Sequence, residues 1–79
     1  MIPRLTRAQH VKGYRLYLEF ADGKKGEVDL EDQLWGEIFE PVREPEEFKR
    51  FLVHPELHTL AWSNGADFAP EYLYNAVAA

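Results

Sequence analysis

The sequence LAWSNGADFAPEYLY spans residues 60–74 and predicts, in succession, the end of a strand, a tight turn and the start of a helix. Leu60 and Trp62 are two residues apart, so an extended chain directs both side chains to one face of a sheet. The Asn64-Gly65 pair tolerates the positive φ angles of a sharp reversal. We therefore expect a strand that carries Trp62 into the core and reverses directly after it.

A helix is predicted to follow this turn. Pro70 suits the first helical position, where its missing N–H costs nothing. Leu73 and Val77 lie four residues apart and, with Tyr72 and Ala76 beside them, give the helix an apolar stripe, which should pack on the sheet that carries Trp62. Asp67 precedes Pro70 by three residues, and we expect it to be a buried or half-buried cap at the helix entry. Five residues of this region are predicted to be structurally important: Trp62, Asn64, Gly65, Asp67 and Pro70.

The N-terminal part of the chain predicts a three-stranded meander. Residues 4–12 form an irregular, basic edge strand, and residues 14–20 alternate apolar and polar side chains with a period of two. Asp22-Gly23 is a strong hairpin signal, after which residues 25–30 return with Val28 on the inner face.

Short helices and one further strand are predicted for the middle of the chain. Asp29 can cap a helix over residues 30–35, and Pro45 opens a second helix whose core-facing residues are Phe48, Phe51 and Leu52. Residues 57–62 then return as a fourth strand. The expected fold class is α+β, with a small antiparallel sheet, short helices and a C-terminal helix in a single domain, residues 1–79.

Composition narrows the possible functions. The chain has no cysteine, no apolar run long enough to span a bilayer and no secretory leader, so we expect a cytoplasmic protein without disulfides. Residues 1–27 carry six Lys/Arg and three Asp/Glu (+3), whereas residues 28–79 carry three and eleven (−8), which together give the net charge of −5. This acidic balance argues against general nucleic-acid binding, which depends on neutralising phosphates.

The sequence contains no recognisable catalytic or metal-binding set. His54 and His58 have the spacing of two ligands on a helix, but Pro55 interrupts the segment. Ser63 lies in the predicted turn rather than in a nucleophile motif, and the five glycines are scattered singly instead of forming a phosphate loop. We expect no enzyme activity, no cofactor and no metal.

Binding is the function class that the composition favours. Arg15 and Tyr17 are predicted on the outer sheet face, together with Glu19 and the basic residues Arg7, Lys24 and Lys25. Trp35 is a further candidate anchor, although a core position is equally compatible with the sequence. A protein partner or a homodimer is therefore expected. Two alternatives stay open, a ligand or enzyme pocket near Trp62 and Asp67, and a nucleic-acid accessory role for the basic hairpin.

The order of these pieces resembles a bacterial family of small proteins, domain of unknown function 2442. The resemblance covers nearly the whole chain and is carried by LYLEFADG (16–23), VDL (28–30), FEPV (39–42) and LAWSNGADFAP (60–70). It implies an α+β fold and brings no catalytic residues. Some members are encoded beside another small protein, in arrangements that resemble toxin–antitoxin pairs, which implies a partner from a neighbouring gene. Others resemble fusions with a DNA-binding helix-turn-helix, which is not expected in a chain that ends at Ala79.

Overall fold

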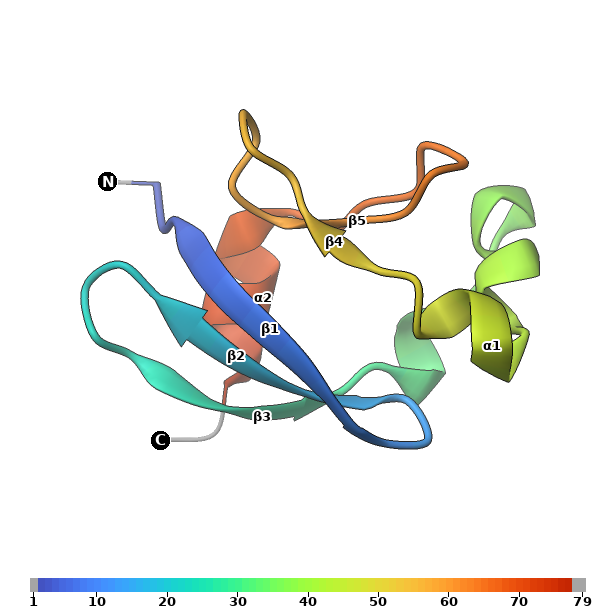
Figure 1. Ribbon diagram of the computed structural model, residues 1–79, viewed down its shortest axis with the longest axis horizontal. Coiled ribbons are helices and arrows are strands. Elements are labelled where there is room, and N and C mark those ends of the chain that lie inside the picture. Colours follow the sequence, from blue (N-terminus) through green and yellow to red (C-terminus); the bar gives the residue numbers. More distant parts are fainter. Residues whose placement is uncertain (1, 78–79) are drawn as a thin grey trace.

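A three-stranded antiparallel meander and a two-stranded ribbon form the framework of the protein (Figure 1). The computed structural model describes residues 2–77. The meander has the order β1-β2-β3, with β1 at Leu5–Lys12, β2 at Arg15–Phe20 and β3 at Lys25–Asp29. The predicted α+β class and the predicted meander are thus confirmed.

Three single turns of 3-10 helix and a short α-helix connect the meander to the ribbon. They are η1 (Glu31–Gln33), η2 (Glu37–Phe39), η3 (Pro41–Arg43) and α1 (Pro45–Phe48). The helix predicted over residues 30–35 is shorter than expected. Asp29 nevertheless acts at its start, because Oδ1 of its carboxylate accepts the backbone N–H of Glu31 at 3.0 Å.

The predicted fourth strand belongs to a separate ribbon. β5 (Leu60–Ala61) pairs with β4 (Leu52–Val53), which the sequence did not predict, and the Leu5 N–H donates to the His58 carbonyl beside it at 2.9 Å. Leu52 was expected in the core but is exposed, because β4 lies at the surface of the molecule. The bond from Leu5, a hydrogen bond from Arg4 Nη2 to His58 Nε2 at 3.2 Å and side-chain packing join the start of the meander to this part of the chain.

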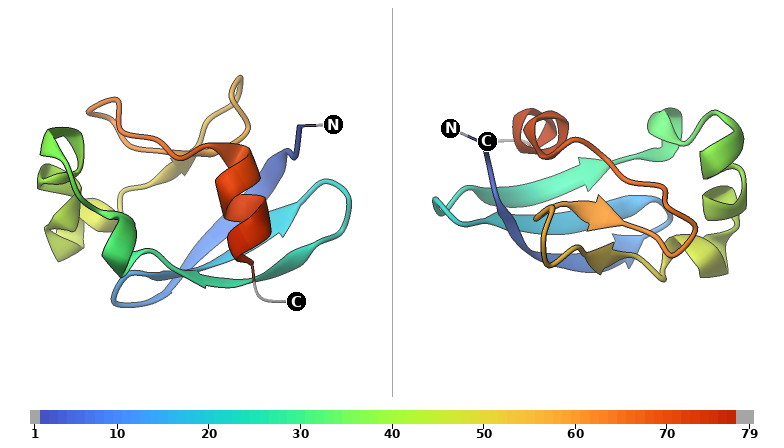
Figure 2. Two further views of the ribbon diagram at one scale, coloured as in Figure 1. Left: turned by 180° about the vertical axis from the view of Figure 1, so that it is seen from behind. Right: turned by 90° about the horizontal axis from the view of Figure 1, so that it is seen from above.

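The C-terminal helix α2 (Pro70–Ala76) lies across one face of the meander (Figure 2). Pro70 begins it, as predicted, and Leu73 and Val77 are buried against the sheet. The ring of Tyr74 meets Phe20 of β2 edge to face, with the centroids 5.1 Å apart. The opposite face of the meander has no such cover among residues 2–77.

Trp62 is 3% exposed and lies in an aromatic cluster between the sheet and the short helices. Its indole Nε1–H donates to the Phe48 carbonyl at 3.0 Å, so burial leaves no polar atom of the indole without a partner. Three rings surround it at centroid distances of 5.9 to 6.1 Å: Phe39, Phe48 and Phe68. The predicted burial of Trp62 is confirmed, but Trp62 follows β5 of the ribbon, whereas α2 packs on the separate meander.

The Asn64-Gly65 turn follows directly after Trp62. Gly65 has φ = 94°, which a residue with a Cβ rarely adopts. The Asn64 side chain accepts the Ala66 N–H at 3.1 Å and donates to the Ile38 carbonyl at 2.8 Å. This turn therefore also fixes η2 beside the ribbon.

Asp67 is not the buried cap that its spacing predicted. Its side chain is exposed, α2 has Ala69 at its N-cap without a side-chain hydrogen bond, and the Asp67 backbone instead forms an isolated bridge with Ala61. The proline at the first helical position removes one free N–H, which reduces the need for a cap.

Candidate functional site

Two surfaces of the described residues could receive a partner. The first, the open sheet face, is the side of the meander opposite α2. Cross-strand partners place nine side chains on it: Arg7, Gln9 and Lys12 from β1, Arg15, Tyr17 and Glu19 from β2, and Lys25, Glu27 and Asp29 from β3. Four of these side chains are cationic and three are anionic, so this face is close to neutral.

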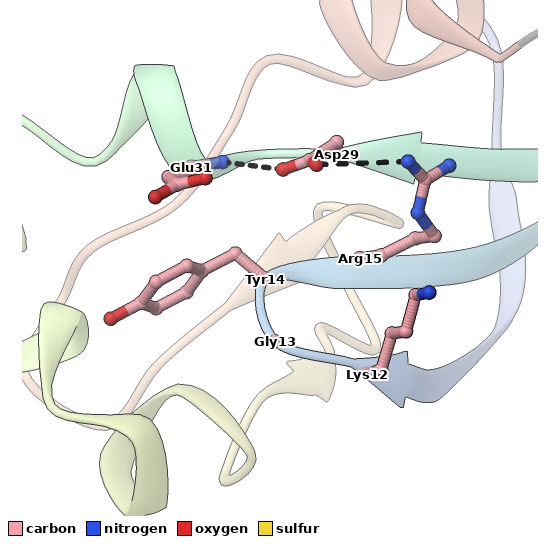
Figure 3. A pocket seen from close by; sticks show the side chains of 6 residues that line it. All are labelled: Lys12, Gly13, Tyr14, Arg15, Asp29 and Glu31. Atoms are coloured by element: carbon pink, nitrogen blue, oxygen red, sulfur yellow. Dashed lines mark hydrogen bonds and ion pairs between the residues drawn. The ribbon is translucent and has the colours of Figure 1, made fainter.

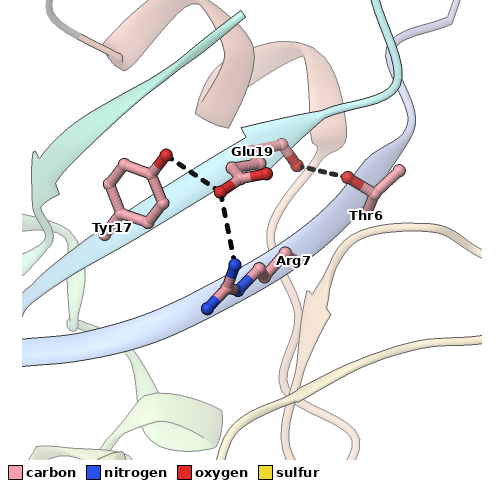
Figure 4. Close-up of polar contacts among 4 residues, drawn as sticks. All are labelled: Thr6, Arg7, Tyr17 and Glu19. Carbon is pink, nitrogen blue, oxygen red and sulfur yellow. Dashed lines mark hydrogen bonds and ion pairs between the residues drawn. The ribbon is translucent and has the colours of Figure 1, made fainter. Parts of the chain in front are cut away.

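Tyr17 lies near the middle of the open sheet face (Figure 4). Its hydroxyl donates to Glu19 Oε2 at 2.9 Å, and Arg7 Nη1 lies 3.7 Å from the same oxygen. Partial burial, followed by the bond to the Glu19 carboxylate, raises the pKa of the Tyr17 hydroxyl. The ring is thus held in one position, which reduces the entropy that a contact to it would cost.

Arg15 lies at the other end of β2 and contacts two carboxylates. Its guanidinium nitrogens are 3.6 Å from Glu27 Oε1 and 3.7 Å from Asp29 Oδ2. Figure 3 shows the contact with Asp29. An open depression of about 360 Å³ adjoins this pair and is lined by Lys12, Gly13, Tyr14, Arg15, Asp29 and Glu31. Both arginines of the face already have acidic neighbours, which lowers their attraction for phosphates.

Lys24, predicted on this same face, lies elsewhere. Its ammonium is 4.2 Å from the centroid of the Tyr74 ring, on the α2 side of the meander. The Tyr74 hydroxyl donates to Asp22 Oδ2, which raises the pKa of the tyrosine and lowers the pKa of the carboxyl. The basic hairpin therefore divides its charges between the two sides of the sheet.

The second surface, the aromatic patch, consists of Ile38, Phe39, Phe68 and Tyr72, and Trp35 precedes Ile38 by three residues in the chain. The Trp35 side chain is 71% exposed, so the core position that the sequence left open is wrong. Ile38 is 48% and Tyr72 38% exposed, while Phe39 and Phe68 are half-buried. Tyr72 was predicted to flank the buried stripe of α2, but its ring stacks on Phe68 at the surface.

Aromatic contacts connect this patch to the core. The Phe39 ring lies 5.1 Å from Phe68 and 6.1 Å from Trp62, and Phe68 lies 5.9 Å from Tyr72. Ile38 is fixed to the same part of the chain through the bond from Asn64 to its carbonyl. These four residues are therefore attached to the packed centre of the molecule, whereas Ile38, Tyr72 and the nearby Trp35 are exposed to solvent.

Exposed carboxylates are frequent in the segments that carry the aromatic patch. Residues 31–40 contain four acidic side chains and no basic one, and Asp67 and Glu71 flank Phe68 and Tyr72 in the sequence. All six of these acidic residues are exposed: Glu31, Asp32, Glu37, Glu40, Asp67 and Glu71. These segments therefore combine exposed apolar side chains with negative charge.

The pocket predicted near Trp62 and Asp67 finds no corresponding cavity here. Aromatic rings fill the space around the indole, and Asp67 lies at the surface. Three depressions among the described residues lie elsewhere, one beside Gly13 and two around Ile2-Pro3-Arg4. No group of three or more His, Asp or Glu side chains within residues 2–77 is arranged to hold a metal ion. None of the helices in that range is long and apolar enough to cross a membrane.

The predicted contact residues do not form one surface. Arg15 and Tyr17 lie on β2 within the open sheet face, whereas Trp35 lies on the connection between η1 and η2. Sequence analysis missed Ile38 and Tyr72 as exposed apolar residues. Their exposure depends on the position of the Asn64-Gly65 turn and on Phe68, which the local pattern does not reveal.

These features define a small α+β domain with an open sheet face and an exposed aromatic patch. Residues 5–79 match the model of the family described as protein of unknown function (DUF2442), and the chain belongs to this family.

A crystal structure from Nitrosomonas europaea, described as a putative DNA-binding protein, is similar to this chain. The TM-score is 0.82 at 26% sequence identity, and the match covers 95% of this chain and 48% of the other. The chain thus spans about half the length of that protein. No curated protein matches the chain.

Proposed function

We propose that this protein is a non-enzymatic interaction module whose aromatic patch, together with Trp35, binds a protein partner. The observation that carries this proposal is the 71% exposure of the Trp35 indole, three residues before Ile38, which is 48% exposed. Tryptophan is among the residues that contribute most to binding when an interface buries them. The rings of Phe39, Phe68 and Tyr72 pack on one another, so they lose little conformational entropy on association.

The exposed carboxylates in the segments that carry the patch favour a partner of particular chemistry. It would have an apolar socket for the indole and Lys or Arg side chains around that socket, because opposite charges steer association and suppress wrong partners. A basic small protein encoded by a neighbouring gene fits this description. In that setting the chain would be the regulatory, antitoxin-like half of a two-gene pair, with Arg15 and Tyr17 on the open sheet face as a secondary contact.

Co-purification with the neighbouring gene product, followed by titration calorimetry, tests this proposal. We expect Trp35→Ala to weaken the complex by about 2 kcal/mol or more, roughly thirtyfold in Kd. Tyr17→Ala should have a smaller effect. Leu57→Ala is the matched control, because Leu57 is 54% exposed on the loop before β5, outside the patch. Equal affinities for the wild type, Trp35→Ala and Leu57→Ala would refute the role of Trp35 in this contact.

Nucleic-acid binding is the second candidate, and the description of the Nitrosomonas europaea protein favours it. That protein is about twice as long as the matched region, so its DNA-binding part need not be the half that resembles this chain. The net charge of −5 and the carboxylates beside Arg7 and Arg15 weigh against it. Fluorescence anisotropy with labelled duplex and single-stranded DNA separates the two candidates: binding that weakens steeply with salt and is lost in Arg7→Ala would favour nucleic acid.

A further inference from the structure

The outer edge of β3 is available for strand pairing. The meander ends at β3, and no described strand pairs with its outer side. Phe20 donates its N–H to the Lys24 carbonyl, and Leu30 donates to the Tyr14 carbonyl, so the even-numbered residues of this segment bond to β2. Because bonding directions alternate along a strand, the N–H and C=O groups of Lys25, Glu27 and Asp29 point to the free edge.

The two edges of the meander differ in regularity. β1 has register shifts at Leu5/Arg7 and His10/Lys12, and its first residues contact the loop before β5. Such bulges and covering segments are the usual protection against edge pairing. β3 pairs with β2 in continuous register from Lys25 to Asp29 and has neither protection among the described residues.

The charges along the β3 edge are complementary to those of a second β3 strand that runs antiparallel to it. In an antiparallel pair of two β3 strands centred on Glu27, Lys25 of each copy faces Asp29 of the other, with both side chains on the open sheet face. The two Glu27 side chains face one another. Arg15 Nη1, 3.6 Å from Glu27 Oε1 in each copy, compensates this like-charge contact.

We propose that two copies of this chain associate through β3, antiparallel about Glu27, and join their meanders into one continuous sheet. The interface would be smaller than the roughly 1,200 Å² of a standard complex, so the dimer is weak and depends on concentration. It leaves the aromatic patch uncovered, which makes this inference independent of the proposed function. Joined in this way, the two open sheet faces would form one surface across the two-fold axis.

Sedimentation equilibrium over a range of concentrations tests the proposal, first with Glu27→Pro. Proline removes the outward N–H at the centre of the interface, while the bonds between β2 and β3 use other residues. We expect the wild type to dimerise with rising concentration, and Glu27→Pro to weaken this by about tenfold or more. Circular dichroism verifies that the variant is folded.

A pair of charge variants provides the decisive comparison. Lys25→Asp places two aspartates opposite each other at each 25–29 pair, and Asp29→Lys places two lysines there. Because like charges then face one another, each variant alone should weaken the dimer by about tenfold or more. Mixed in equal amounts, the two should associate, because each cross-strand pair then joins an aspartate to a lysine. Lys12→Asp makes the same charge change on β1 of the same face and should leave the dimer intact.

A wild type that stays monomeric at every concentration overturns the proposal. The β3 edge would then be available only to a strand of another protein. Dimers that persist in both Glu27→Pro and Lys25→Asp, or that Trp35→Ala abolishes, would place the contact elsewhere and equally overturn it. A mixture of the two charge variants that stays monomeric, with both variants folded, would contradict the antiparallel register.

Discussion

Replacing Trp62 with alanine should bring this protein close to unfolding. The indole is 3% exposed, contacts the rings of Phe39, Phe48 and Phe68, and donates a hydrogen bond to the Phe48 carbonyl. Truncation leaves a cavity and a buried carbonyl without that donor, and large aromatic residues truncated in this way cost about 3–5 kcal/mol. A chain of 79 residues has a total stability of roughly 4–12 kcal/mol at about 0.05–0.15 kcal/mol per residue.

Chemical and thermal unfolding followed by circular dichroism measure this loss. For a domain of this size, about 3 kcal/mol lowers Tm by about 12 °C or more. Trp35→Ala is the matched control, because the same side chain is removed at a position that is 71% exposed, and a change within about 0.5 kcal/mol is expected. A Trp62→Ala protein that melts within a few degrees of the wild type would refute the central position of this residue.

Three further substitutions test the contacts around it. Asn64→Ala removes the bonds to the Ile38 carbonyl and to the following turn, and should cost about 1–2 kcal/mol in a urea titration. Asp67→Ala should change stability by less than about 0.5 kcal/mol in the same assay, whereas a cap would cost about 1 kcal/mol. Tyr74→Phe should raise the pKa of Asp22 toward its ordinary value, as followed by NMR titration of the carboxyl. Because the pKa of Asp22 is lower in the folded than in the unfolded protein, the bond stabilises the wild type at pH values above the unfolded pKa. This stabilisation is lost as the pH falls through the folded pKa. An Asp22 titration that is the same in Tyr74→Phe and the wild type would exclude the bond.

Local signals predicted most of the framework. Alternation from Tyr14 to Phe20, the Asp22-Gly23 reversal and Pro70 at a helix start each depend on a few neighbouring residues, and each is found in the structure. Burial of Trp62 followed from its spacing to Leu60. In these positions backbone geometry and side-chain polarity favour the same structure, which makes them readable from a single sequence.

The remainder depends on contacts between distant segments. β4 has two residues, too few to show any periodicity, and it forms only because β5 lies beside it. Asp67 has the spacing of a cap, but the backbone bridge to Ala61 and the proline at the helix start remove that role. The exposure of Trp35 could not be predicted, because a tryptophan in this sequence context is equally compatible with a core position and with an interface.

The distribution of roles between the two tryptophans is the central claim, and NMR of the two indole N–H groups with the neighbouring gene product tests it most directly. Before addition, the Trp62 N–H, bonded to the Phe48 carbonyl, should exchange slowly with solvent, while the Trp35 N–H should exchange fast. On addition, the Trp35 resonance should shift and become protected, and the Trp62 resonance should stay where it is. Fast exchange at Trp62, or an unchanged Trp35 signal in a saturated complex, would contradict the account.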